Sequence, residues 1–295
     1  MPINLEERQL LERLASNGPQ PADYPLFTAL LTRAFERTEH ARGHFAMIRD
    51  VLADTLDVST MQGFALRKPH GYPGDFEIID RIYVRHRATE PRLARWDEYF
   101  HAQPATRAVC NRKAYFHRLL DRLAACNSAR VLNVASGPCR DVREWLRGHP
   151  QRPVRFDCID MDEHALQYAS RLCAGLQERI CWTRANAFRF RPSEQYDLIW
   201  VAGLCDYFSD ARVVRLISRL APALRPGAEL VLGNFGPGNP SRAYMEIIGE
   251  WTLQHRSASR LCALAQEAGI REANVRIGAE PQGVNLFLHI RNDDA

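Results

Sequence analysis

The fold is decided by one stretch of sequence, Val131-Leu132-Asn133-Val134-Ala135-Ser136-Gly137-Pro138-Cys139-Arg140-Asp141. Its pattern predicts an apolar strand, a tight turn and the start of a helix. Small residues in the turn let a ligand approach the backbone, and a helix start offers free N–H groups to a carboxylate or phosphate. As a three-glycine fingerprint the turn is incomplete, because Ala135 and Cys139 stand where glycines are usual. The stretch alone therefore also fits a turn that binds nothing.

Downstream of this stretch, apolar strands and amphipathic helices alternate to the end of the chain. Repeated strand–helix units predict an α/β fold with a mainly parallel sheet and helices on both faces. Ligands of such sheets bind at the carboxyl ends of the strands, near the point where the strand order reverses. We expect strands over residues 130–135, 154–160, 180–185, 196–202, 228–235, 275–278 and 285–290, and helices over 141–146, 162–173, 209–220 and 257–268.

Upstream of residue 129 the apolar spacing is helical throughout. A loop rich in turn formers, residues 69–75, interrupts it and leads into an amphipathic helix that carries Ile78, Ile79 and Ile82. We therefore expect two domains, a helical one over residues 1–128 and an α/β one over residues 129–295. Further helices are expected over residues 5–14, 26–35, 45–52, 93–100 and 115–123.

Composition excludes several classes of protein. The chain has 295 residues, of which 46% are hydrophobic and 25% charged, an ordinary globular balance that argues against disorder. No apolar run is long enough for a transmembrane helix, and the N-terminus lacks the pattern of a secretory signal. The net charge of +4 is too small to indicate nucleic-acid binding, so we predict no nucleic-acid partner.

The eight cysteines and ten histidines do not indicate a metal site. No cysteine pair has C-x-x-C spacing, and cysteines scattered through apolar segments are typical of reduced core residues. This pattern predicts a cytoplasmic protein. His40 and His44 lie four residues apart on an expected helix, but no third ligand accompanies them, so no metal is predicted.

Polar residues follow the second and third expected strands. Asp160 ends the second strand, where a carboxylate can accept two hydrogen bonds from a ribose diol; the alternative is a helix cap, a role that suits Asp162 better. Asn186 and Ala187 follow the third strand, where a side-chain amide could meet an adenine edge. The alternative for Asn186 is an ordinary turn residue.

Two more motifs follow, the buried strand Tyr196–Leu204 and the turn Arg225-Pro226-Gly227. The whole series resembles the class I S-adenosylmethionine-dependent methyltransferases over roughly residues 129–295. This resemblance implies a seven-stranded, Rossmann-like sheet whose last strand is reversed, with S-adenosyl-L-methionine as cofactor. Asn133 stands where the family usually has an acid. The cofactor-binding residues that the resemblance implies are Ala135, Ser136 and Gly137 at the methionine end, Asp160 at the ribose, Asn186 and Ala187 at the adenine, Gly203 and Leu204 in the floor, and in addition Met161.

The N-terminal part also resembles a bacterial subgroup that makes 3-hydroxypalmitic acid methyl ester, a diffusible quorum-sensing signal. The matching features are Gly71-Tyr72-Pro73-Gly74-Asp75, Asn111-Arg112, residues 133–138, Asp206-Tyr207 and Trp251-Thr252-Leu253. The resemblance implies carboxyl O-methylation of a 3-hydroxy fatty acid to a fatty acid methyl ester. It also implies that residues 1–128 form a lid and substrate-binding domain.

Several residues are candidates for the chemistry. The loop and helix over residues 68–83 form either a packed connection or a lid, and in the second case Tyr72, Asp75 or Tyr83 faces the reacting methyl group. Asp206 and Tyr207 follow the fourth strand, where substrates of this fold meet the sulfonium. The predicted catalytic residues are Tyr72, Tyr83 and Asp206, the predicted substrate-binding residues are Arg112, Tyr115 and Tyr207, and His70 and His117 are alternative bases.

Arg112 has two interpretations, an ion pair on the surface or a partner for a carboxylate of cofactor or substrate, which a guanidinium fork matches. For the whole protein, the alternatives are O- or N-methylation of another small metabolite, a nicotinamide-dependent oxidoreductase, a nucleic-acid methyltransferase and a binding module without turnover. The incomplete glycine pattern counts against the oxidoreductase. Asn239-Pro240 is followed by Ser241, so the chain lacks an Asn-Pro-Pro-Tyr motif. No feature of the sequence indicates an oligomeric state.

Overall fold

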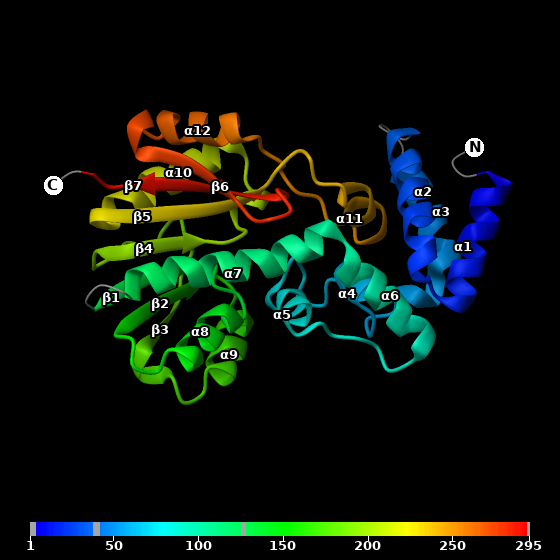
Figure 1. Ribbon diagram of the computed structural model, residues 1–295, viewed down its shortest axis with the longest axis horizontal. Helices are drawn as coiled ribbons and strands as arrows, with labels where there is room; N and C mark the ends of the chain where they lie inside the picture. The colour runs from blue at the N-terminus through cyan, green and yellow to red at the C-terminus, as the bar shows by residue number, and fades with distance from the viewer. Residues whose placement is uncertain (1–3, 38–41, 125–127, 294–295) are drawn as a thin grey trace. The chain divides into compact units, whose positions relative to one another are not determined.

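The computed structural model describes residues 4–37, 42–124 and 128–293. Its centre is a seven-stranded sheet with the strand order β3-β2-β1-β4-β5-β7-β6 (Figure 1). This confirms the predicted α/β, Rossmann-like architecture. The strands are β1 (Ala129–Val134), β2 (Val154–Asp160), β3 (Ile180–Arg184), β4 (Tyr196–Val201), β5 (Leu224–Phe235), β6 (Val275–Ala279) and β7 (Asn285–Arg291).

Strand direction and register follow the expected pattern. β1 pairs in parallel with β2 on one side and with β4 on the other, so the strand order reverses at β1. β7 pairs antiparallel with both β5 and β6, which confirms that the last strand is reversed. β5 begins at Leu224, before the Arg225-Pro226-Gly227 turn, and its register with β4 shifts between Tyr196 and Leu198. The carboxyl ends of β3, β2, β1 and β4 therefore lie side by side along one edge of the sheet.

Two apolar layers cover the faces of the sheet. On one face, α10 (Asp210–Leu220) and α12 (Ala258–Glu267) bury leucines and isoleucines against β1, β4, β5 and β7. On the other face, α8 (Arg140–Gly148), α9 (Glu163–Leu172) and α7 (Pro104–Ala124) cover a second apolar cluster. There Phe116 of α7 stacks on Trp200 of β4 at 4.8 Å between ring centroids. Figure 1 shows α10 and α12 on one side of the sheet and α8 and α9 on the other.

The chain divides into two compact units, and the sheet lies in the second, residues Ala108–Gly238 and Leu253–Ala295. The first unit consists of Met1–Arg107 and Asn239–Thr252. Its core contains an aromatic cluster in which Phe27 lies 5.3 Å from Trp96 and Tyr99 lies 5.1 Å from Tyr244 between ring centroids. Its helices are α1 (Leu5–Asn17), α2 (Tyr24–Arg37), α3 (Arg42–Leu52), α4 (Met61–Arg67), α5 (Phe76–Val84), α6 (Pro91–Ala102) and α11 (Arg242–Ile248).

The division differs from the expected boundary at residue 129 for two physical reasons. Most of α7 packs on the sheet through Phe116, Leu119 and Leu120, and so belongs with the second unit. The segment Asn239–Thr252 follows β5 in sequence, yet its helix α11 packs against α2 and α3 in the first unit. Tyr244 of α11 donates a hydrogen bond to Gln62 there, at 3.0 Å. The assignment of residues 1–128 as a lid and substrate-binding domain stays a prediction.

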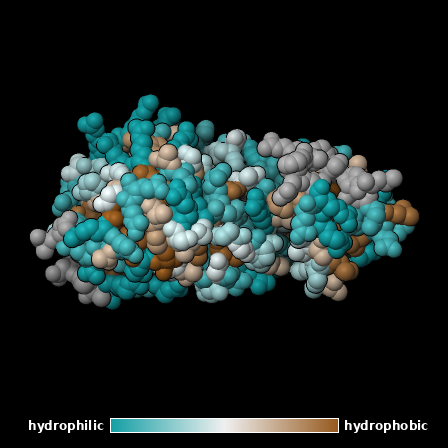
Figure 2. Space-filling model, turned by 90° about the horizontal axis from the view of Figure 1, so that it is seen from above, coloured by the Kyte–Doolittle hydropathy of each residue, from teal (hydrophilic) through white to brown (hydrophobic). Residues whose placement is uncertain are grey.

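Few large hydrophobic side chains stay on the surface. The face in Figure 2 is mainly hydrophilic, and hydrophobic residues appear on it as separate patches. Scattered apolar residues of this kind are normal for a folded protein. Within the described ranges, no helix combines the length and the apolar character needed to cross a membrane.

Candidate functional site

The carboxyl edge of the sheet, formed by the carboxyl ends of its parallel strands, brings together all nine predicted cofactor-binding residues. Ala135, Ser136 and Gly137 follow β1, Asp160 ends β2 and Met161 follows it, Asn186 and Ala187 follow β3, and Gly203 and Leu204 follow β4. Because these four strands are neighbours and parallel, their ends meet at one edge. These residues follow four different strands and therefore lie along one edge of the sheet, as the predicted topology requires.

The turn after β1 is built from left-handed backbone. Ala135 has φ 53°, Gly137 φ 55° and Cys139 φ 51°, so two residues other than glycine adopt the conformation that glycine favours. The amide of Ser136 donates to the carbonyl of Ile159 in β2 at 3.1 Å, which ties the turn to the neighbouring strand. The glycine fingerprint can therefore be incomplete, because Ala135 and Cys139 adopt the left-handed φ angles that glycines usually supply in such a turn.

The surface of this turn is suited to a ligand. A Cβ atom placed on Gly137 would meet no atom within 4 Å, so the space above it is open. The hydroxyl of Ser136 is buried and has no hydrogen-bond partner among the described residues. Buried polar groups nearly always have a partner, so this hydroxyl points to a bound group that supplies one.

Asp160 connects the ends of β1 and β2. One carboxylate oxygen accepts the amide of Gly137 at 3.0 Å, and the other accepts the amide of Asp162 at 2.9 Å. Burial raises the pKa of Asp160, and these backbone amides oppose the rise. The capping role falls to Asp162, which accepts the amide of His164 at the start of α9. Each oxygen of Asp160 keeps a lone pair for a further donor such as a ribose hydroxyl.

Asn186 and Met161 lie together beside Asp160. The side-chain oxygen of Asn186 accepts the amide of Phe188 at 2.9 Å, so Asn186 holds the turn after β3. Its amide nitrogen lies 3.7 Å from the sulfur of Met161, whose side chain is 67% exposed. An exposed apolar side chain next to an amide offers both a flat contact and a hydrogen-bonding group to a base. The adenine contact itself stays a prediction.

A buried arginine from α7 lies beside the residues that follow β4. Arg112 of α7 is 8% exposed, and its Nη1 atom lies 2.7 Å from the position that a Cβ atom on Gly203 would occupy. Gly203 is therefore needed for the close approach of this guanidinium, a role that the sequence alone did not reveal. The charge of Arg112 acts on Asp206 and on Asp141, and it lowers the pKa of both against the larger raising effect of burial.

Asp206 is buried in the short 3-10 helix η4 (Cys205–Tyr207) after β4. Its carboxylate accepts the amide of Phe235, the last residue of β5, at 2.7 Å. Burial raises the pKa of Asp206 to about 7, although Arg112 and Arg256 favour its charged form. Tyr207, the next residue, is 38% exposed.

Sequence reasoning missed Arg256, which organises this region. It is 4% exposed and donates to Asn234 at 2.7 Å, to the carbonyl of Cys205 at 2.9 Å and to the carbonyl of Phe208. It also pairs with Asp210 at 2.7 Å. Arg256 thereby fixes the loop after β4 to the end of β5. No sequence signal marks it, because its partners are distant in the chain and two of the four are backbone carbonyls.

Tyr115 lies on the face of the sheet in a chain of polar contacts. Its hydroxyl is 2.6 Å from Nε2 of His289 in β7, and its ring stacks on Phe287 at 4.0 Å. The other ring nitrogen of His289 lies 3.0 Å from Glu229, whose pKa is lowered to about 2 by this contact and by Arg276. The substrate-binding role of Tyr115 stays a prediction.

The predicted catalytic tyrosines belong to the first unit. Tyr72 is 36% exposed in the Pro/Gly loop, and Tyr83 is half-buried in α5. Asp75 caps α5 by accepting the amides of Glu77 and Ile78, each at 2.9 Å, and burial raises its pKa. That these tyrosines face the reacting methyl group stays a prediction.

The two alternative bases both have partners within their own units. His70 lies 2.9 Å from Glu77 in the first unit. His117 donates to the carbonyl of Asp141 at 2.8 Å in the second. Among the residues that the structure describes, no group of three or more histidine, cysteine or acidic side chains is arranged to hold a metal ion. His40, and the side chain of His44, lie outside the described part of the chain.

Comparison with known proteins indicates a methyltransferase. Residues 131–227 match a family model described as a methyltransferase domain. Over these residues the chain is similar to a methyltransferase domain. Its position coincides with the strands and turns that line the edge described above, and S-adenosylmethionine is the cofactor. This confirms the predicted S-adenosylmethionine-dependent methyltransferase.

Solved structures with the same fold span most of the chain. A protein from Bordetella parapertussis, described as a possible exported protein, is 21% identical with a TM-score of 0.67, covering 94% of this chain and 98% of its own. The S-adenosylmethionine-dependent methyltransferase SibL is 16% identical with a TM-score of 0.54, covering 97% and 96%. Magnesium protoporphyrin IX methyltransferase from Synechocystis, solved with S-adenosylhomocysteine, is 10% identical with a TM-score of 0.53, covering 79% and 99%. At these identities the likeness shows the fold. None of the curated proteins compared with this chain matches it significantly.

The residues at the carboxyl edge fit S-adenosylmethionine. The open space above Gly137 and the buried hydroxyl of Ser136 suit the amino-acid end of the molecule. The carboxylate of Asp160 suits a diol, and the exposed Met161 beside Asn186 suits a flat base. The three places follow one another along the edge in the order β1, β2, β3, which matches the order of the three parts of the molecule.

Proposed function

We propose that the protein transfers the methyl group of S-adenosylmethionine to a small-molecule acceptor, and that this acceptor is the carboxylate of a 3-hydroxy fatty acid. The observation that supports it best is the buried Arg112 beside Gly203, at the carboxyl end of β4. A guanidinium held there can bind a carboxylate through its fork. The product would be a fatty acid methyl ester of the kind that serves in quorum sensing.

In this proposal the edge residues hold the donor. Ser136 and Gly137 contact its methionine end, Asp160 accepts both ribose hydroxyls, and Asn186 with Met161 contacts the adenine. When bound, the donor supplies a sulfonium whose methyl carbon is open to in-line attack. The protein contributes alignment and exclusion of water, which are the main sources of rate for such a transfer.

The acceptor oxygen forms the new C–O bond as the C–S bond breaks, and the pair of electrons from that bond returns to sulfur. A carboxylate is already a nucleophile, so it needs no general base. Arg112 would hold one of its oxygens and leave the other directed at the methyl carbon. Tyr115 and Tyr207 would line the acceptor side, and Tyr72 and Tyr83 would close over it from a lid.

A second candidate is O- or N-methylation of another small metabolite, and Asp206 is the observation that favours it. A carboxyl group with a pKa of about 7 is partly ionised at neutral pH and can accept a proton from a hydroxyl or amine. Asp206 lies after β4, within the electrostatic reach of Arg112. For this class of acceptor it would be the general base.

We further propose that the reaction takes place in the cytoplasm. The seven described cysteines, Cys110, Cys139, Cys158, Cys173, Cys181, Cys205 and Cys262, are all free thiols. Free thiols are typical of proteins in a reducing compartment.

The test is incubation of the full chain with methyl-labelled S-adenosylmethionine and 3-hydroxypalmitic acid, followed by mass spectrometry. We expect a labelled methyl ester that alkaline hydrolysis returns to the free acid. The Asp160→Ala variant should form much less of it at low donor concentration. Label that resists hydrolysis, in an ether or methylamine from a metabolite mixture, would replace the carboxyl proposal with the second candidate. Absence of label in any acceptor would contradict both.

A further inference from the structure

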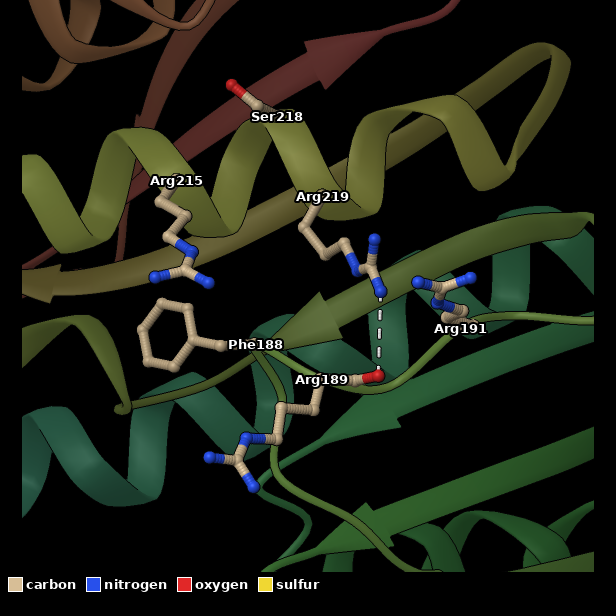
Figure 3. A pocket seen from close by; sticks show the side chains of 6 residues that line it. All are labelled: Phe188, Arg189, Arg191, Arg215, Ser218 and Arg219. Carbon is tan, nitrogen blue, oxygen red and sulfur yellow. Dashed lines mark hydrogen bonds between the residues drawn. The ribbon is translucent and has the colours of Figure 1, made fainter.

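A pocket lined by arginines lies on the second unit, apart from the carboxyl edge residues described above. Its volume is about 470 Å³, and it opens between the loop after β3 and the helix α10. Figure 3 shows that the loop supplies one side and α10 the other. The lining residues are Phe188, Arg189 and Arg191 from the loop and Arg215, Ser218 and Arg219 from α10.

The positive charge of this pocket is not balanced by acids. Within the described ranges, Arg189, Arg191 and Arg215 form no ion pair with a carboxylate, in contrast to many exposed arginines elsewhere in the chain, such as Arg92 and Arg276. Arg215 and Arg219 lie four residues apart on α10, and like charges so placed on a helix lower its stability when no counter-charge is present.

The two acids close in sequence to the pocket are already engaged. Asp210, at the start of α10, pairs with Arg256 and Arg260 at 2.7 Å each. Glu194, in the loop after β3, pairs with Arg130 at 3.3 Å. Among the described residues, these acids therefore supply no ion pair to the arginines of the pocket, and a bound ligand can supply the counter-charge.

Two of the arginines are held in place by their surroundings. Arg219 donates through Nε to the carbonyl of Phe190 at 3.0 Å, which ties α10 to the loop. The guanidinium of Arg215 lies 5.8 Å from the centroid of the Phe188 ring, and Phe188 lies 4.9 Å from Phe208. In Figure 3 the Arg215 guanidinium and the Phe188 ring face each other across the pocket. A site whose cations are fixed before binding loses less conformational entropy when a ligand arrives.

We propose that this pocket binds a soluble ligand that carries two or more phosphate groups. Guanidinium forks match phosphate oxygens, and several positive charges suit a ligand with more than one negative charge. Figure 3 shows the guanidinium groups spread along the pocket rather than gathered at one point, which favours linked phosphates over a single carboxylate. The small net charge of the whole chain, +4, favours a compact ligand over a long polyanion such as RNA.

The proposed phosphate site is distinct from the methyl-donor site and goes beyond the proposed function. It shares no residue with the predicted cofactor set. The two are nevertheless connected, because the amide of Phe188 donates to the side chain of Asn186, the predicted adenine contact. Arg189 and Arg191 are exposed and make no side-chain hydrogen bond among the described residues, so their substitution should leave the fold intact.

The probe is inorganic diphosphate, titrated calorimetrically into the full chain without S-adenosylmethionine, at about 0.15 M salt so that exposed charges are screened. The test variant is Arg189→Gln/Arg191→Gln. The control variant, Arg155→Gln/Arg171→Gln, removes the same charge from two exposed arginines of β2 and α9 that do not line the pocket.

We expect wild type and control to bind diphosphate alike, and the test variant to bind at least about tenfold more weakly. Equal weakening in both variants would overturn the proposal, because it would show a non-specific effect of charge. So would the absence of binding in the wild type.

Two further arms separate soluble ligands from macromolecules. The same variants are tested for sedimentation with vesicles of phosphatidylcholine and phosphatidylglycerol, and for binding to a single-stranded RNA. Diphosphate should bind, and neither vesicles nor RNA should show a loss specific to Arg189→Gln/Arg191→Gln. Binding of vesicles or RNA that depends on these arginines and that diphosphate does not displace would overturn the proposal in favour of a membrane or nucleic-acid surface.

Discussion

Asp160 has two tasks at the residue scale. Its carboxylate oxygens accept the backbone amides of Gly137 and Asp162, which joins two strand ends, and each oxygen keeps a lone pair for a further donor. Arg112, Gly203 and Asp206 are coupled in a similar way at the end of β4, where a glycine makes room for a guanidinium that acts on a buried carboxyl group. Substitution at each of these places has an effect that can be separated from a loss of folding.

Asp160→Ala should weaken S-adenosylmethionine binding by about 1–3 kcal/mol, the scale of hydrogen bonds lost from a buried site. Calorimetric titration measures it. Asp162→Ala is the matched control, since it removes the cap of α9 and should lower stability by about 1 kcal/mol without changing affinity. Unchanged affinity in Asp160→Ala would remove Asp160 from the ribose role.

Gly203→Ala should impair turnover more than folding. The added Cβ would lie 2.7 Å from Nη1 of Arg112, and the far end of that side chain can move away at little cost in stability. In the proposed function Arg112 binds the acceptor carboxylate, so we expect displacement of its guanidinium to lower kcat/KM about tenfold or more. Gly148→Ala is the control, because a Cβ there meets nothing within 4 Å. Kinetic constants equal to those of wild type in Gly203→Ala would show that Arg112 has no role in the reaction.

Asp206 should make stability fall as pH rises. Its pKa is about 7 in the folded chain against an ordinary value of 3.8 for an aspartic acid, so between these values the folded state holds a proton that the unfolded state has lost. The free energy of unfolding that Asp206 contributes therefore decreases from about pH 4 to about pH 7. Urea unfolding across this range should show the decrease in wild type and a smaller one in Asp206→Asn, whose amide oxygen can still accept from Phe235. Parallel curves would place the pKa of Asp206 near its ordinary value.

At the scale of elements, the strands were predictable and some helices were not. All seven expected strands are present, because each is a compact apolar run bounded by turn residues. The short helices α4 and α11 have no such local signature: α11 is held by burial of Tyr244, Ile247 and Ile248 against the first unit. The site shows the same difference. Residues at the ends of strands could be predicted from the expected strand order, but Arg256 could not, because it is held by backbone carbonyls that are distant in the sequence.

Tyr115 shows how helix α7 is attached to the sheet. Tyr115→Phe removes the hydroxyl that contacts His289 at 2.6 Å and keeps the ring stacked on Phe287. We expect the free energy of unfolding to fall by about 1 kcal/mol, since one buried hydrogen bond is lost. Chemical denaturation measures this. A raised KM for the acceptor at unchanged stability would instead support the predicted substrate role.

At the scale of the whole molecule, the chain passes between two units more than once. It leaves the first unit within α7, forms most of the second, returns for Asn239–Thr252 and ends in the second. The edge proposed to bind the donor lies in the second unit, and the predicted lid residues Tyr72 and Tyr83 lie in the first. Donor binding and acceptor turnover should therefore respond to different substitutions.

Tyr72→Phe and Tyr83→Phe should lower kcat with little change in S-adenosylmethionine affinity. Each variant loses a hydroxyl outside the unit that holds the donor, so only a step that needs the lid is affected. Steady-state kinetics and calorimetry on the same preparations make the comparison. Kinetic constants identical to those of wild type would show that both tyrosines only pack within the connection formed by residues 68–83.

The first unit is assembled from pieces far apart in the gene. Its core needs Tyr244 bonded to Gln62, and the amide of Ala105 donates to Ser241 at 3.1 Å. During synthesis, the ribosome must therefore translate five of the seven strands of the sheet before the N-terminal helices meet their last partner. A nascent chain that stops before residue 239 would expose an incomplete helical bundle, so the earliest part of the polypeptide to emerge would be among the last to reach its native state.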